Sequence, residues 1–266
     1  MAAPLIDIGA NIAHDSFDED FDEVLQRAHD AGVDRIVVTG SSDDSNTAAA
    51  RLASEYGGTL FATAGVHPHH ASEYSDASDA TIRRLVNEPQ VVAVGECGLD
   101  YFRNFSPREA QLDAFRRQLE IAKETGKPLF LHQRDAHDDF VEALEPYLPD
   151  VSRAVAHCFT GEGESLREYL QMGLFIGITG WICDERRGKH LYDIVSIIPD
   201  DRLMVETDAP YLLPRTLKPK PKSRRNEPMY LPEVVRIIAE ARGQSTDHVA
   251  RVTTENAIRF FALPAA

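Results

Sequence analysis

The stretch Val91-Val92-Ala93-Val94-Gly95-Glu96-Cys97-Gly98-Leu99-Asp100 joins an apolar run to acidic residues and glycines. This pattern is typical of a buried strand that ends in a carboxylate. An unpaired carboxylate in such a place would cost several kcal/mol, so Glu96 must be neutralised, paired or bound to a metal. Three other apolar runs end in the same way, at His132, at His157 and at Glu206-Thr207-Asp208. Four strand ends therefore offer metal-type ligands.

Eight apolar segments follow one another along the chain, with helical stretches between them. Their spacing of about 30 residues is that of a strand–helix–strand unit, and eight units predict an α/β protein with a (β/α)8 TIM barrel. An open doubly wound sheet would carry a Gly-rich loop after its first strand, and Gly9-Ala10-Asn11 is not one. The expected strands end near Asn11, Gly40, His67, Glu96, His132, His157, Gly180 and Asp208.

We expect a single domain, residues 1–266, because no Ser/Gly/Pro-rich linker interrupts the chain. Extra C-terminal helices begin at Pro232 and Ser245. Two further helix starts are predicted by capping-box patterns at Ser16-x-x-Glu19 and Ser106-Pro107-Arg108-Glu109. In a barrel, the C-terminal strand ends converge on one mouth, so the four metal-type ligands would meet there.

The composition excludes several classes of protein. The net charge is −15, from 43 acidic residues against 28 Lys and Arg, which argues against a bulk nucleic-acid coat and against a membrane partner. Three scattered cysteines favour a reducing compartment, and the chain has neither an N-terminal signal pattern nor a long apolar run. We therefore expect a soluble cytoplasmic protein, and we expect a monomer.

Five motifs occur in this order along the chain: Gly65-Val66-His67-Pro68, Gly95-Glu96-Cys97-Gly98-Leu99-Asp100, His132-Gln133-Arg134-Asp135-Ala136, His157-Cys158-Phe159-Thr160-Gly161 and Glu206-Thr207-Asp208-Ala209-Pro210-Tyr211. With these motifs the chain resembles the TatD-type metal-dependent deoxyribonucleases of the amidohydrolase-like barrels, from Asp7 to the C-terminal helix. Most of the family carries His-x-His at the end of the first strand, where this chain has Gly9-Ala10-Asn11, and Asp7-x-Gly9-x-Asn11 resembles the TatD subgroup itself.

The resemblance implies a barrel nuclease with 3′-5′ exonuclease action on single-stranded DNA and RNA, in DNA repair or nucleic-acid turnover. It implies that Glu96, His132 and His157 hold a divalent cation, and that Asp208 is a further ligand or the catalytic base for the attacking water. His67 would contact the phosphate or pack against its loop. Asn11 would bind the metal weakly, orient a water or bond to the backbone.

Phosphodiester hydrolysis requires a nucleophile, neutralisation of the phosphate and stabilisation of the leaving oxygen, and a metal ion with open positions supplies all three. Two imidazoles and a carboxylate suit Zn²⁺ or Mn²⁺, but Asn11 in place of an imidazole shifts any second site towards Mg²⁺. We expect Mg²⁺, with Mn²⁺ and Zn²⁺ as alternatives, at one tighter site and a weaker one near Asp208.

Structural explanations compete for the same residues. Glu96 could pair with Arg134, the histidines could bond to backbone carbonyls, and Asp208 could cap a turn. The basic segment 218–225 is either a phosphate-binding loop or a solvated one, and Trp181, Tyr101 or Phe159 could stack bases. The cysteines beside the expected ligands, Cys97 and Cys158, should point away from the metal, because neighbours in a strand face opposite sides.

Other functions fit the same mouth. A small-molecule hydrolase acting on a cyclic amide or ester, or an aminoacyl-tRNA deacylase, would use the same metal ligands. A barrel that has lost catalysis and serves as a binding protein is a third alternative, which the intact ligand set opposes.

Overall fold

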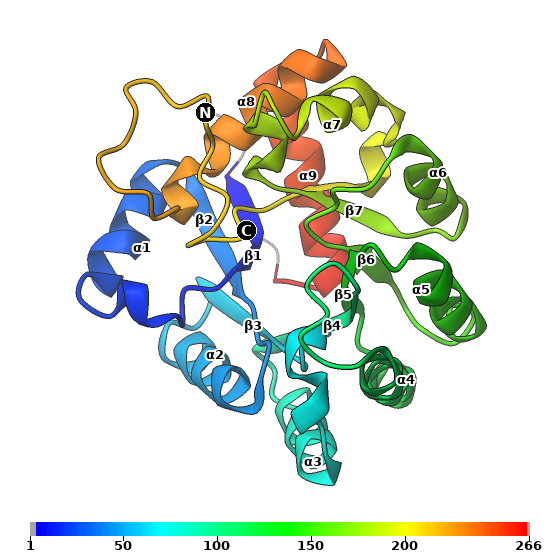
Figure 1. Ribbon diagram of the computed structural model, residues 1–266. Helices are drawn as coiled ribbons and strands as arrows, with labels where there is room; N and C mark the ends of the chain where they lie inside the picture. The colour runs from blue at the N-terminus through cyan, green and yellow to red at the C-terminus, as the bar shows by residue number, and fades with distance from the viewer. Residues whose placement is uncertain (1–3, 265–266) are drawn as a thin grey trace.

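Eight parallel strands pair in chain order in the computed structural model, which describes residues 4–264. Two backbone hydrogen bonds join the segment after β8 to β1: Asp208 N to Gly9 O at 2.8 Å, and Asn11 N to Ala209 O at 2.7 Å. The sheet thus closes on itself, and the predicted (β/α)8 TIM barrel is confirmed (Figure 1). The strands are β1 Leu5–Ala10, β2 Val33–Val38, β3 Leu60–Ala64, β4 Val91–Asp100, β5 Leu129–Arg134, β6 Ala154–Ala156, β7 Phe175–Ile178 and β8 Leu203–Val205.

Helices surround the ring of strands (Figure 1). They are α1 Phe21–Asp30, α2 Asp43–Glu55, α3 Asp76–Leu85, α4 Arg108–Thr125, α5 His137–Leu144, α6 Gly163–Gln171, α7 Lys189–Ile194, α8 Leu231–Arg242 and α9 Thr246–Phe261. Short 3-10 helices lie at η1 Asp15–Phe17, η2 Pro68–Glu73, η3 Glu145–Tyr147, η4 Gly180–Cys183, η5 Val195–Ile197, η6 Asp200–Arg202 and η7 Pro228–Tyr230. Within residues 4–264, none of the helices has the length and apolar character needed to span a bilayer.

The last helix, α9, closes the N-terminal end of the barrel. Phe260, Phe261 and Leu263 pack among the apolar side chains inside the ring of strands. The rings of Phe260 and Phe175, the first residue of β7, have centroids 5.1 Å apart. Because this end is filled with apolar side chains, a polar site inside the barrel is expected at the C-terminal strand ends.

The helix starts differ from two of the sequence predictions. The capping box at Ser16 does not form: residues 15–17 make η1, and α1 begins at Phe21. Ser106 is not a cap either, because its hydroxyl donates to His69 O and accepts from Ser72 N, and α4 begins at Arg108. At Ser106 a contact with a distant loop thus occupies the hydroxyl, whereas at Ser16 the hydroxyl pairs locally with His14 Nδ1 at 3.0 Å. The C-terminal helices were predicted correctly, and Ser245 caps α9.

The long segment between β8 and η7 (Figure 1) leads to residues that bind α1 and its N-cap through an ionic cluster. The guanidinium of Arg225 donates to both carboxylate oxygens of Asp20, at 2.8 and 2.7 Å, and to Glu227. Arg27 donates to the same two acids at 2.8 Å. Arg225 is thus a structural residue, whereas Lys218, Lys220, Lys222 and Arg224 of the basic segment are at least partly exposed.

We predict that Asp20→Asn weakens the fold in a pH-dependent way. Arg225 and Arg27 hold the pKa of Asp20 well below its usual range, so the charged form stabilises the folded chain above pH about 4, the unfolded pKa. The substitution should therefore lower the free energy of unfolding by about 1–2 kcal/mol at pH 7. Urea denaturation should show the difference shrinking as the pH falls from about 5 to about 3.

The exposed Asp18 provides the control, since Asp18→Asn removes a neighbouring charge outside the cluster. It should leave stability within about 0.5 kcal/mol of the wild type. An Asp20→Asn deficit of constant size across this pH range would contradict an ionic origin.

Candidate functional site

A cavity of about 660 Å³ opens at the C-terminal ends of the strands. Side chains that follow β1, β3, β6 and β8, together with Glu96 from within β4 and His132 from within β5, reach it. They include Asn11, His67, Glu96, His132, His157 and Asp208. The structure thus brings all six residues singled out from the sequence to one place.

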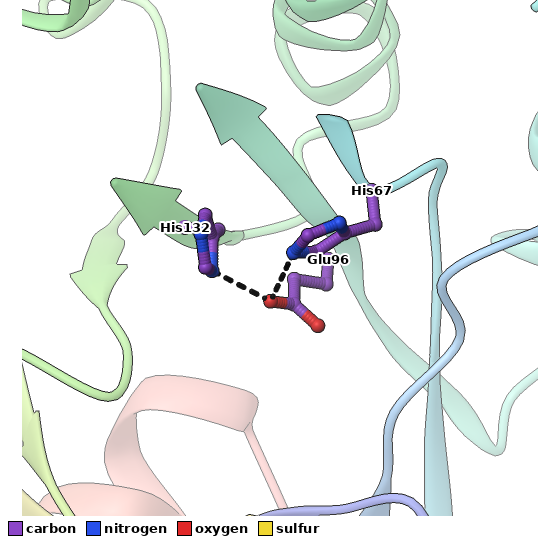
Figure 2. Close-up of side chains that lie close together, drawn as sticks. All are labelled: His67, Glu96 and His132. Carbon is purple, nitrogen blue, oxygen red and sulfur yellow. Dashed lines mark ion pairs between the residues drawn. The ribbon is translucent and has the colours of Figure 1, made fainter. Parts of the chain in front are cut away.

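Glu96 lies at the centre of three imidazoles. Its Oε1 atom is 2.7 Å from His157 Nε2, 3.0 Å from His132 Nδ1 and 3.3 Å from His67 Nε2. Figure 2 shows His67 and His132 approaching the carboxylate from different strands. A register shift between Val94 and Cys97 in the pairing of β4 with β5 places Glu96 at this point. The ion pair with Arg134 does not form; that guanidinium lies 3.8 Å from the centroid of the Phe102 ring.

The pKa values of these side chains depend on their burial and on the short distances between their charged groups. Burial opposes the charge on Glu96, but His157 and His67 hold its pKa well below the usual range. Burial likewise opposes a charge on His157, yet Glu96 and Glu206 raise its pKa. The pKa of His67 falls to about 4, because burial of its ring outweighs the attraction of Glu96. The site thus favours a charged Glu96 between two imidazoles of opposite tendency, with the proton affinity of His157 raised and that of His67 lowered.

Ligand atoms of His67, Glu96 and His132 all lie within 4.8 Å of one another, a grouping that could hold a metal ion. His157 Nε2 faces the same oxygen of Glu96. Nitrogen and carboxylate-oxygen donors at such separations are typical of sites for divalent transition metals. The cluster therefore points to divalent metal binding.

Asp208 borders the same cavity, in the left-handed conformation with φ 54°. Its Oδ1 atom accepts a hydrogen bond of 3.0 Å from Asn11 Nδ2, so Asn11 orients this carboxylate. Burial raises the pKa of Asp208 to about 7. Asp7 accepts hydrogen bonds from the backbone N and the hydroxyl of Thr207, which fixes the backbone just before Asp208.

Glu206 is a functional candidate that the sequence did not single out. Its carboxylate is fully buried and accepts from His157 Nδ1 at 3.2 Å and from Cys158 N at 2.5 Å. A Cβ atom at Gly9 or at Gly177 would collide with its oxygens, so the two glycines leave room for it. The first histidine of His-x-His would fall at position 9. This chain has a glycine there, and the carboxylate of Glu206 occupies the space beside it.

Asp100 is a second buried acid, and it lies beside His132. It is buried, and its Oδ2 atom lies 2.8 Å from His69 Nε2 and 3.5 Å from His132 Nε2. Its other oxygen accepts from the backbone N of Arg103. Asp100 could have been found from the sequence, because it is the acidic residue that ends the strand carrying Glu96.

The prediction for Cys158 was wrong. Cys97 is buried on the side of β4 away from the cavity, as expected, but Cys158 borders the cavity with its Sγ atom 3.7 Å from Thr179 Oγ1. Strand alternation does not apply there, because β6 ends at Ala156 and Cys158 has φ 44°.

Comparisons with known proteins agree with this geometry. A family model described as TatD related DNase matches residues 6–262. A relative from Erwinia billingiae, named 3'-5' ssDNA/RNA exonuclease TatD, is 51% identical over 98% of this chain and 100% of its own length. A relative of the same name from Klebsiella pneumoniae is 50% identical over 97% of this chain and 98% of its own length.

Solved structures give the same result. The TatD homologue YJJV from Escherichia coli has a TM-score of 0.89 and 30% identity, covering 99% of this chain and 100% of that one. A TatD family hydrolase from Entamoeba histolytica has a TM-score of 0.88 and 28% identity with the same coverage. The resemblance read from the motifs is confirmed, and the chain belongs to the TatD related DNase family.

Proposed function

We propose that this chain is a metal-dependent 3′-5′ exonuclease that hydrolyses phosphodiester bonds of single-stranded DNA and RNA. The observation that carries the proposal is the convergence of Glu96, His132, His157 and Asp208 on one cavity. The name shared by full-length relatives at about half identity supports the substrate and the polarity. DNA repair or nucleic-acid turnover is the cellular role that we propose for such an enzyme.

In this proposal Glu96, His132 and His157 hold the tighter metal, and Asp208 contributes to a weaker position. Two imidazoles and one carboxylate leave coordination positions open for water and phosphate, so the donor set fits a catalytic ion. We propose Mg²⁺ in activity, with Mn²⁺ and Zn²⁺ as the competing ions that the nitrogen donors favour. A divalent cation bound there supplies Lewis acidity at the phosphate and a water of lowered pKa.

The chain's own residues then perform the remaining steps. Asp208, oriented by Asn11, accepts the proton of the attacking water. The Nδ1 atom of His67 accepts from the backbone N of His69, so the neutral ring carries its proton on Nε2. That N–H faces Glu96 Oε1 at 3.3 Å and borders the cavity, so in this proposal a phosphate oxygen bound beside Glu96 accepts from it, and His67 is a substrate contact in preference to a ligand.

The test is the release of mononucleotides from single-stranded DNA and RNA labelled at either end, with Mg²⁺, Mn²⁺, Zn²⁺ or a chelator. Loss from the 3′ end that the chelator stops is the expected result. Equal rates from both ends would refute the polarity. Turnover of a cyclic amide or of aminoacyl-tRNA, without mononucleotide release, would refute the nuclease.

Two further predictions accompany the enzyme. The monomer expected from the sequence implies a particle of 29.6 kDa in sedimentation equilibrium. The cytoplasmic location stays a prediction as well, which fractionation of cells would check.

We predict that Glu206→Gln weakens metal binding. A carboxylate accepts from both His157 Nδ1 and Cys158 N, whereas an amide offers only one acceptor. With the amide nitrogen facing Nδ1, the proton of His157 moves to Nε2, and that atom can no longer bind a cation. Isothermal titration with Mn²⁺ should show affinity lowered about 10- to 100-fold.

Glu168→Gln is the matched control. Glu168 also pairs with a histidine, His137, at 2.7 Å, but neither residue borders the cavity. This variant should bind Mn²⁺ like the wild type. An equal loss of affinity in both variants, or none in Glu206→Gln, would contradict the positioning role of Glu206.

A further inference from the structure

Large exposed hydrophobic side chains gather at the mouth of the cavity. Within residues 4–264 they are Phe105, Phe102 and Tyr211, which are 67%, 55% and 52% exposed. Phe105 and Tyr211 border the cavity, and Phe102 lies in the same loop as Phe105. Isolated apolar residues on a surface require no explanation, but their concentration at one polar cavity indicates a ligand with an apolar face.

Phe105 is held in place by a rigid loop between β4 and α4. The backbone N of Arg103 donates to Asp100, and the Ser106 hydroxyl binds His69 O. Gln111 donates to the carbonyl oxygens of Asp100 and Ser106. The Phe105 ring meets the ring of His69 edge to face, with centroids 4.8 Å apart. Because folding fixes the loop, binding there would cost little conformational entropy.

Tyr211 stands on the other side of the mouth. It follows β8, whereas Phe105 follows β4, and strands four apart in a ring of eight lie on opposite sides of the axis. Tyr211 N donates to Asp208 O at 2.9 Å, which ties this ring to the segment of Asp208. The Glu96 cluster and Asp208 belong to the cavity that the two rings border.

We propose that Phe105 and Tyr211 are stacking platforms for the two unpaired nucleobases that flank the scissile phosphate. The proposal rests on the proposed function, which places that phosphate at the Glu96 cluster. A chain that crosses the mouth would then carry one base towards each ring. Stacking on aromatic rings tolerates every base, as an exonuclease that degrades DNA and RNA requires.

Positive charge lies beside the Phe105 platform. Arg103 and Arg134 border the cavity, and their guanidinium carbons are 5.9 and 3.8 Å from the centroid of the Phe102 ring. Guanidinium groups there suit the phosphates next to a stacked base, on a chain whose net charge is −15.

The stacking candidates from the sequence are less suited to this role. Phe159 is buried, and Arg108 lies over the ring of Tyr101 at 4.1 Å. Trp181 borders the cavity but is covered in the same way by Arg187, at 4.4 Å.

The test compares intact single-stranded DNA with oligonucleotides that carry an abasic residue at the last or the penultimate 3′ position. Affinity is measured by fluorescence anisotropy in the presence of a chelator, and kcat/KM is measured with Mg²⁺. Phe105→Ala and Tyr211→Ala should each weaken binding of the intact strand about 5- to 150-fold. Each loss should vanish for one abasic position, a different one for each variant.

Two substitutions separate stacking from simple packing. Phe105→Leu keeps the apolar contact and should behave like Phe105→Ala, whereas Phe105→Trp should bind like the wild type. Equal losses on intact and abasic strands, or tight binding by Phe105→Leu, would overturn the proposal. A wild-type protein that binds the strands but releases no mononucleotide would refute the exonuclease, while the anisotropy results would still decide the stacking.

Discussion

Glu96→Gln is expected to lower the rate of metal-dependent mononucleotide release by at least about 10³-fold, because a bound cation contributes several kcal/mol to transition-state stabilisation. The glutamine has nearly the volume of Glu96 but no charge. It faces His67, His132 and His157 at the position where the cation would be held. Calorimetry with Mn²⁺ should show no tight site, and turnover should return in part at high metal concentration.

Folding must be checked in the same variant. Glu96 is 6% exposed and forms a buried pair with His157, and breaking such a pair costs about 3–5 kcal/mol. Thermal unfolding would detect this loss, and Glu96→Asp, which keeps the charge on a shorter stem, should recover metal binding in part. Tight Mn²⁺ binding by folded Glu96→Gln would contradict its role as a ligand.

The barrel could be predicted because its signal is periodic. Each strand is a short apolar run, and the runs recur at the spacing of a strand–helix unit, so errors at single boundaries do not alter the topology. Local signals failed where a distant contact competes for the same side chain. Ser106 donates to His69 O, and Arg225 donates to Asp20. The residues that flank Ser106 and Arg225 in the sequence do not indicate either contact.

The candidate site was predictable in part, because Glu96, His132 and His157 follow short apolar runs and barrel geometry brings such residues to one mouth. Two strands do not end where the sequence placed their ends: β4 continues to Asp100 and β5 to Arg134, so Glu96 and His132 reach the cavity from within their strands. Glu206 and Asp100 each lie beside a histidine, about 50 and 30 residues away in the chain, so only the fold shows the pairing. Exposure distinguishes the proposed stacking residues, and it cannot be read from residue type, which is why the sequence suggested Phe159, which is buried, and not Phe105, which is exposed.

Asp208→Asn should separate binding from chemistry. The asparagine can still accept the hydrogen bond from Asn11 through Oδ1, so the local structure should persist. It cannot accept a proton from water, and loss of a general base lowers kcat about 10²- to 10⁴-fold. The tighter metal site that we propose at Glu96 and two histidines should keep its affinity for Mn²⁺, in contrast to Glu96→Gln.

Asn11→Ala tests the role of Asp208 as the base by removing the side chain that orients it. Without the amide, Asp208 keeps its chemistry but loses its orientation, so kcat should fall less than in Asp208→Asn while KM stays constant. The two substitutions should not add in the double variant, because a carboxylate that is absent gains nothing from being oriented. Near-normal kcat in Asp208→Asn, or full additivity, would assign the proton to another group. The remaining acid of that segment, Glu206, is fully buried and accepts from His157 and Cys158, so it is poorly placed to meet the attacking water.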